Sequence, residues 1–166
     1  MTDFQVVATE TDVAEVARLA HVIWREHYVP IIGQAQVDYM VSRFQSEQAI
    51  AAQVADGYEY YLIVHQGQRA GYAAVAADGD ASSLLLSKIY VEKSMRGHGL
   101  GKTALEFIED LCRQRGIGTI WLTVNKNNTA SIAWYERVRF VNAEPIIQDI
   151  GGGFVMDDFK MEKTIG

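Results

Sequence analysis

The chain has 166 residues, 49% of them hydrophobic, and a formal net charge of −6 at pH 7. This length predicts a single domain over residues 1–166. The acidic net charge argues against nucleic acid as a partner, and the apolar runs are too short for a membrane span. Cys112 is the single cysteine, so it cannot form a disulfide within the chain or build a thiolate metal site. The N-terminus does not resemble a secretory signal, and we expect a cytoplasmic protein without a metal.

The first third of the chain predicts one strand followed by three helices. The predicted elements are a strand over residues 4–8, a helix that ends at Pro30 and Gly33, a helix over residues 36–44 and a helix that ends at Gly57. Thr9 with Asp12, or Thr11 alone, is expected to cap the first helix, and Ser46 the third.

The middle of the chain predicts a hairpin and a further strand. Residues 58–65 and 70–77 are rich in Tyr, Val and Ile, and residues 66–69 between them are typical of a hairpin turn. Residues 78–80 are expected to turn the chain into a strand over residues 84–91.

The last part of the chain alternates helices and strands. We expect a helix over residues 104–115, a strand over 119–124, a short helix ending near Arg137, and closing strands over 139–147 and 154–163 joined across 151–153. Gly116 suits the C′ position of the first helix, and Asn127 or Asn128 can cap the second. This order predicts an α/β fold: a mixed, mostly antiparallel sheet of about seven strands with helices on both faces, and a β-α-β unit whose two strands are parallel neighbours.

A glycine-rich segment stands between the strand 84–91 and the helix 104–115. Residues 96–102 read Arg-Gly-His-Gly-Leu-Gly-Lys. Helix N-termini carry amide groups without an intrahelical partner and a partial positive charge, and glycines let an anion approach them. With Arg96 and Lys102 beside these amides, the segment predicts a binding site for a phosphorylated ligand.

Two common phosphate-binding motifs do not fit this segment. A P-loop needs a glycine five residues before Gly101, where Arg96 stands. A Rossmann site needs a carboxylate after the next strand, but residues 125–128 there are Asn, Lys, Asn and Asn.

The chain resembles the GCN5-related N-acetyltransferase (GNAT) family in several segments. Residues 96–101 match the family's Arg/Gln-x-x-Gly-x-Gly/Ala loop, and residues 88–91 resemble the strand end before it. Residues 128–137 are similar to the family's Asn-x-x-Ala/Ser-x-x-x-Tyr-Glu-Lys segment, and Phe140 to the aromatic residue that follows it. The resemblance covers nearly the whole chain and implies acetyl-CoA as the co-substrate and a β-α-β cofactor-binding core.

The resemblance also implies roles for particular residues. The loop amides and two cations would bind the CoA pyrophosphate, backbone groups of the strand end would bind the pantetheine, and Asn128 would hold its arm. Tyr135 would protonate the leaving thiolate, and the Val91 amide would stabilise the oxyanion. The predicted cofactor-binding residues are Ile89, Tyr90, Val91, Met95, Arg96, Gly97, His98, Gly99, Leu100, Gly101, Lys102 and Asn128.

The acceptor side is less defined. In this family the first helix-loop-helix region forms a wall of the acceptor pocket, so we expect Trp24, His27 and Tyr28 there, although helical spacing also suits His27 as a core residue. Asp157 and Asp158 lie in an apolar strand and point to opposite faces, so at most one can contact a cationic amine. Both could equally be solvated charges of an edge strand.

Two positions depart from the family pattern. Leu85 stands where many relatives have a glutamate, which some of them use, often through water, to deprotonate the amine. The base therefore stays open among His27, an aspartate of the last strand and a water chain. Arg139 replaces a usual glycine, which would strain the backbone if that glycine has a positive φ.

The resemblance implies an N-acetyltransferase that transfers the acetyl group directly to a primary amine within a ternary complex. Residues 86–139 carry nine Lys/Arg and five Asp/Glu, whereas the remainder carries six and sixteen, which favours a small cationic amine as the acceptor. The alternatives are an enzyme acting on protein α- or lysine amines, and a CoA-binding regulatory module without turnover. The family also allows a homodimer.

Overall fold

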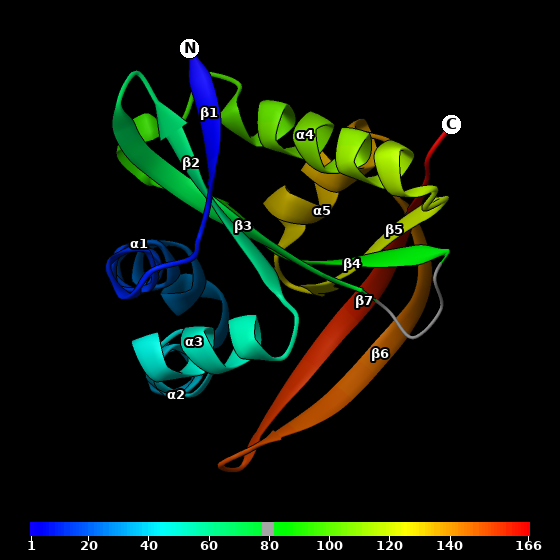
Figure 1. The fold of residues 1–166 in the computed structure, drawn as a ribbon. Coiled ribbons are helices and arrows are strands. Elements are labelled where there is room, and N and C mark those ends of the chain that lie inside the picture. The colour runs from blue at the N-terminus through cyan, green and yellow to red at the C-terminus, as the bar shows by residue number, and fades with distance from the viewer. Residues whose placement is uncertain (78–81) are drawn as a thin grey trace. The chain divides into compact units, whose positions relative to one another are not determined.

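The computed structural model describes residues 1–77 and 82–166, so the turn predicted at residues 78–80 lies outside the described residues (Figure 1). The elements in chain order are β1 (Thr2–Val6), α1 (Glu10–Ile32), α2 (Gln34–Phe44), α3 (Glu47–Ala55), β2 (Glu59–His65), β3 (Gln68–Ala77), β4 (Ser83–Val91), the 3₁₀ helix η1 (Lys93–Met95), α4 (Leu100–Arg115), β5 (Thr119–Asn125), α5 (Thr129–Arg137), β6 (Val141–Gly151) and β7 (Phe154–Thr164). Among these described helices none is both long and apolar enough to cross a membrane.

The seven strands are arranged in the order β1-β2-β3-β4-β5-β7-β6. The pairs β1–β2, β2–β3, β5–β7 and β6–β7 are antiparallel, whereas β4 and β5, which flank α4, are parallel. The predicted mixed and mostly antiparallel sheet with a β-α-β unit is therefore confirmed.

The chain divides into two compact units. The first comprises residues 1–76 and 88–106, and the second comprises residues 77–87 and 107–166. The residues of β4 and α4 are thus shared between the units, so that the end of β4 and the start of α4 belong to the first.

In the first unit, a capping box starts α1. The Thr9 hydroxyl accepts a hydrogen bond from the Asp12 amide at 3.2 Å, and the Asp12 carboxylate accepts from the amides of Ala8 and Thr9 at 3.0 and 3.1 Å. These backbone donors lower the pKa of Asp12. The cap expected from Thr9 and Asp12 is confirmed.

The expected end of α1 at Pro30 and Gly33 is confirmed at Gly33, and Pro30 lies within the last turn of the helix. The helix continues to Ile32 and ends at Gly33, whose φ of 87° is in the region that favours glycine. A proline so close to the end of a helix removes one hydrogen bond near its last turn and breaks few that would follow. The Gly33 amide still donates to the Val29 carbonyl at 2.9 Å.

The β2–β3 hairpin has a shorter turn than the sequence indicated. β3 begins at Gln68, so Gln66 and Gly67 alone form the turn, with φ values of 51° and 78°. Two positive φ values match the right-handed twist of the flanking strands. The pairing of His65 with Gln68 closes the hairpin.

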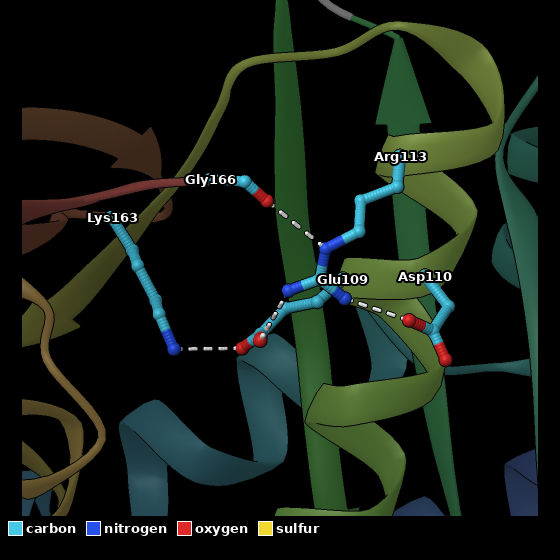
Figure 2. A network of polar contacts seen from close by, with 5 residues as sticks. All are labelled: Glu109, Asp110, Arg113, Lys163 and Gly166. Atoms are coloured by element: carbon cyan, nitrogen blue, oxygen red, sulfur yellow. Dashed lines mark hydrogen bonds and ion pairs between the residues drawn. The ribbon is translucent and has the colours of Figure 1, made fainter.

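In the second unit, polar contacts fix the C-terminal half of α4 (Figure 2). Buried Glu109 accepts from Lys163 of β7 at 2.8 Å, and Arg113 bonds Asp110 at 2.7 Å and the Gly166 carbonyl at 3.3 Å. Cys112 is fully buried on the apolar face, as expected for a structural thiol, and burial raises its pKa. α4 is therefore anchored to the last strand along its second half.

Arg139 adopts the conformation that the family glycine would favour. Its φ is 79°, and its amide donates to the Glu136 carbonyl at 3.0 Å. Phe140 follows with a hydrogen bond from its amide to the Tyr135 carbonyl at 2.9 Å. Because residues 139–140 close α5 in this way, β6 begins at Val141 and not at Arg139 as predicted. The left-handed backbone at Arg139 costs about 1 kcal/mol.

Candidate functional site

The end of β4 lies against β3 at an unusually close approach. A Cβ atom on Gly71 of β3 would overlap the carbonyl oxygen of Tyr90, so this position admits glycine alone without a backbone shift. The Glu92 amide then donates to the Ala70 carbonyl at 2.7 Å. Gly71 was not among the predicted site residues, although a glycine inside an apolar strand indicates such an approach.

The parallel ladder between β4 and β5 includes the start of both strands. It pairs Ser83–Leu85 with Thr119–Trp121 in the second unit. The predicted pantetheine-binding residues, Ile89 to Val91, lie further along β4, in the part of the strand that belongs to the first unit.

After β4 the chain forms the glycine loop, which we define as residues 96–99, and enters α4 at Leu100. Gly97 and Gly99 have φ values of 90° and 70°, and a Cβ atom at either would meet no atom within 4 Å. On one side of them Arg96 donates from Nε to the Val91 carbonyl at 3.0 Å. On the other side Thr103 donates to the Gly99 carbonyl from its amide at 3.1 Å and its hydroxyl at 3.0 Å.

The amide groups of residues 97–102 are the main chemical feature of this loop. No residue in the described part of the chain accepts a hydrogen bond from any of them. Arg96 and Lys102 are exposed beside them, and the positive end of the α4 dipole lies at the same place. Unpaired donors, open space and two cations together suit a phosphate-bearing ligand.

In the first unit, α1 brings two of the predicted acceptor residues to the side chain of Tyr90. The Trp24 ring centroid lies 5.8 Å from that of Tyr90, and Tyr28 lies 6.2 Å from it with the two hydroxyl oxygens 3.3 Å apart. Trp24 and Tyr28 are 4.4 Å apart, and His27 contacts the edge of Tyr28 at 4.7 Å. We call Trp24, Tyr28 and Tyr90 the aromatic cluster.

Lys88 lies two residues before Tyr90 and thus on the same face of β4. Its ammonium nitrogen is 5.1 Å from the Tyr60 ring and 5.7 Å from the Tyr58 ring, and it donates to Gln53 at 3.0 Å. Burial lowers the pKa of Lys88 to about 8. The sequence placed Lys88 in the strand end 88–91 but did not indicate its burial, since a lysine in a strand is usually exposed.

In the second unit, Asn128 is the N-cap of α5. Its side-chain oxygen accepts from the Ser131 amide at 3.4 Å, and the residue is 2% exposed. Asn127, the alternative cap, instead donates its amide to the Asn125 side chain at 2.9 Å. The capping function of Asn128 is confirmed, and its contact with the cofactor stays a prediction.

Tyr135 lies on α5 between two aromatic neighbours. Its ring centroid is 5.3 Å from that of Trp134 and 5.5 Å from that of Phe140, both in tilted edge geometry. The ring is therefore held by packing while the residue stays partly exposed. Its role as the acid stays a prediction.

The two aspartates of β7 point to opposite faces, as predicted. Asp157 is exposed and pairs with Lys126 at 2.8 Å, whereas Asp158 is 2% exposed. Burial, and to a smaller extent the charge of Asp157, raises the pKa of Asp158 to about 6, although a hydrogen bond from Thr123 acts in the opposite direction.

Comparison with known proteins shows the family of this chain. The model of the acetyltransferase (GNAT) family matches residues 17–140. The [ribosomal protein bS18]-alanine N-acetyltransferase of Escherichia coli K12 is 32% identical over 98 residues, which cover 59% of this chain. The chain spans 65% of the length of that relative.

Two further proteins show the range of the similarity. The streptothricin acetyltransferase of Streptomyces lavendulae is 33% identical over 86 residues, covering 52% of this chain and 46% of that protein. The PaiA N-acetyltransferase of Thermoplasma acidophilum, solved in complex with coenzyme A, has the same fold, with a TM-score of 0.79 over 99% of both chains at 16% identity. The chain therefore belongs to the acetyltransferase (GNAT) family, whose members use acetyl-CoA as the co-substrate.

Proposed function

We propose that this protein is an N-acetyltransferase that moves the acetyl group of acetyl-CoA directly to a primary amine. The observation that carries the proposal is the set of unpaired amides at residues 97–102, next to Arg96 and Lys102. A diphosphate supplies several acceptor oxygens and the negative charge that this end of α4 favours. The family match over residues 17–140 supports the same ligand.

The remainder of the co-substrate is assigned from the family resemblance. We propose that the backbone of residues 89–91 binds the pantetheine in the manner of an added strand. These residues form the end of β4 immediately before η1 and the glycine loop, so a ligand whose diphosphate is bound by the loop could extend along them. Asn128 is proposed to hold the pantetheine arm with the part of its amide that does not cap α5.

The chemistry requires an acid and a base. The amine nitrogen attacks the thioester carbon, the oxyanion that forms accepts a hydrogen bond from the Val91 amide, and the C–S bond then breaks. Tyr135 is proposed to give its phenolic proton to the departing thiolate, since a phenol with a pKa near 10 is protonated at neutral pH. The proton lost by the amine goes to a base that Leu85 cannot supply.

The proposed acceptor is a small cationic amine. The acidic residues outside 86–139 and the aromatic cluster of Trp24, Tyr28 and Tyr90 both suit a cation, since aromatic faces attract ammonium groups. Lys88 on the same face of β4 disfavours a second positive charge close to it, so an acceptor with well-separated charges fits best. One relative is named for acetylation of streptothricin.

A protein α-amine is the second candidate acceptor. The relative from Escherichia coli is named for the alanine of ribosomal protein bS18, and it matches more of this chain than the streptothricin enzyme does. A CoA-binding module without turnover would also keep the glycine loop, and Leu85 in place of a glutamate is the feature that favours it.

A panel assay separates these three functions. Purified protein is incubated with acetyl-CoA and with polyamines, amino acids, streptothricin-like amines or a peptide with an N-terminal alanine, and thiol release is followed. Turnover with a small cationic amine supports the proposal, and turnover restricted to the peptide assigns the second function. Binding of CoA by calorimetry without thiol release for any amine would identify a binding module.

A further inference from the structure

One residue of the glycine loop has a side-chain contact that the predicted site does not include. His98 lies between Gly97 and Gly99, and its imidazole ring lies 5.4 Å from that of His65, with 30° between the ring planes. His65 is the last residue of β2 and is 33 positions earlier in the chain. Both residues belong to the first unit.

His65 is itself held by two strands. Its Nδ1 atom lies 2.9 Å from the Thr2 hydroxyl of β1, in hydrogen-bond contact. Its backbone is paired with Thr2 on one side and with Gln68 of β3 on the other. The ring of His65 is therefore a fixed surface, although it lies at a strand end.

The centre of the glycine loop is held by few contacts of its own, so a fixed neighbouring side chain can order it. A Cβ atom added at Gly97 or Gly99 would meet no neighbouring atom of the described chain, so no packing there restricts these two residues. Glycine also loses more conformational entropy on ordering than any other residue. The fixed points on either side are the Arg96–Val91 and Thr103–Gly99 hydrogen bonds. Between the two glycines, His98 carries the one side chain, and its imidazole ring contacts the His65 ring.

We propose that His65 is a positioning residue for co-substrate binding. Its ring fixes His98 and thereby holds the amides of residues 97–102 in the arrangement that receives the diphosphate of acetyl-CoA. A loop ordered before binding does not lose this entropy on association, so the ring pair increases affinity. This inference rests on the proposed function, because it assumes that the loop binds the diphosphate.

The test is a double-mutant cycle on CoA affinity, measured by calorimetry with His65→Ala, His98→Ala and the double variant. Each single change is expected to raise the Kd about threefold to tenfold, the range that a ring pair supplies. The double variant is expected to match His98→Ala, because His65 acts through His98. In His65→Ala the kcat at saturating acetyl-CoA is expected to stay unchanged, because a positioning residue that acts on the loop changes the affinity.

Two further variants separate positioning from a general loss of stability. His65→Phe keeps the ring and is expected to restore most of the affinity, and His21→Ala removes an exposed imidazole of α1 and is expected to leave the Kd unchanged. An unchanged Kd in His65→Ala, full additivity in the double variant, or no recovery in His65→Phe would each overturn the inference. Failure of the unmodified protein to bind CoA would instead overturn the proposed function.

Discussion

The two ends of α4 differ in whether their terminal backbone groups are hydrogen-bonded within the described chain. At the N-terminal end, the amides of residues 97–102 find no acceptor in the described chain, and the loop before them leaves open space. At the C-terminal end, the Gly116 amide donates to the Arg113 carbonyl at 3.3 Å and the Ile117 amide to the Cys112 carbonyl at 2.9 Å. Gly116 takes a φ of 68°, as the C′ position requires.

Under the proposed function, this contrast would let one helix bind a ligand at its first end while contacts with β7 hold its second half. Backbone donors left unpaired at one end can be satisfied by an anion, at a cost in stability of the free protein. The buried Glu109–Lys163 pair and the capped carbonyls hold the other end (Figure 2). We therefore expect substitutions at the first end to change affinity and substitutions at the second end to change stability.

Gly99→Asp is expected to have the largest effect, about a thousandfold loss of CoA affinity. Aspartate tolerates a φ of 70° better than most residues, so the fold should survive. Its carboxylate would occupy the open space beside the free amides and would repel the diphosphate. Calorimetry measures the affinity, and thermal unfolding checks the fold.

Gly116→Asn is the matched control at the other end of α4. It places a short polar side chain at a similar φ of 68° and is expected to change the CoA affinity by less than about twofold. Equal losses in the two variants would remove the distinction between the ends.

Tyr135→Phe is expected to lower kcat about a hundredfold without changing the Kd for CoA. The substitution removes the proposed acid and keeps the ring between Trp134 and Phe140. Steady-state kinetics at saturating co-substrate measures the effect, and Trp134→Phe serves as the packing control. An unchanged kcat would exclude Tyr135 as the acid.

Glu109→Gln is expected to reduce the free energy of unfolding by about 3 kcal/mol, because it leaves the Lys163 ammonium without its buried partner. The CoA affinity should not change. Urea unfolding measures the stability, and Asp110→Asn is the control, since Asp110 is 66% exposed and its pair with Arg113 is worth less than about 1 kcal/mol. Similar losses in both variants would contradict the anchoring role of Glu109.

Asp158 is expected to have a smaller effect on stability than Glu109. Both are buried acids, but Asp158 lies beside the like charge of Asp157 whereas Glu109 is paired with the Lys163 ammonium. The pKa of Asp158 is raised to about 6, so between about pH 4 and 6 the folded state binds more protons than the unfolded state, and stability falls as pH rises through this window. Asp158→Asn is expected to be about 2 kcal/mol more stable than the unmodified protein at pH 7 and equal to it at pH 4. Urea unfolding at both pH values tests this, and equal stability at pH 7 would contradict it.

The sequence predicted features that depend on local patterns. The Thr9–Asp12 cap, the Gly116 C′ position and the parallel β4–β5 pair follow from residue types at fixed spacing, and all three are confirmed. The glycine loop follows in the same way, because its glycines and cations are adjacent in the chain.

Features that depend on contacts between distant segments could not be predicted in this way. The approach of Gly71 to Tyr90, the ring pair of His65 and His98, and the aromatic surroundings of Lys88 each join elements far apart in the chain. A periodicity identifies the buried face of an element but does not identify its partner.

The central claim, that the amides of residues 97–102 bind the diphosphate of CoA, is tested most directly by amide NMR. In a titration of ¹⁵N-labelled protein with CoA, we expect the largest chemical-shift changes at these six amides, and little change at Gly116 and Ile117. Saturable binding that leaves residues 97–102 unshifted would contradict the account.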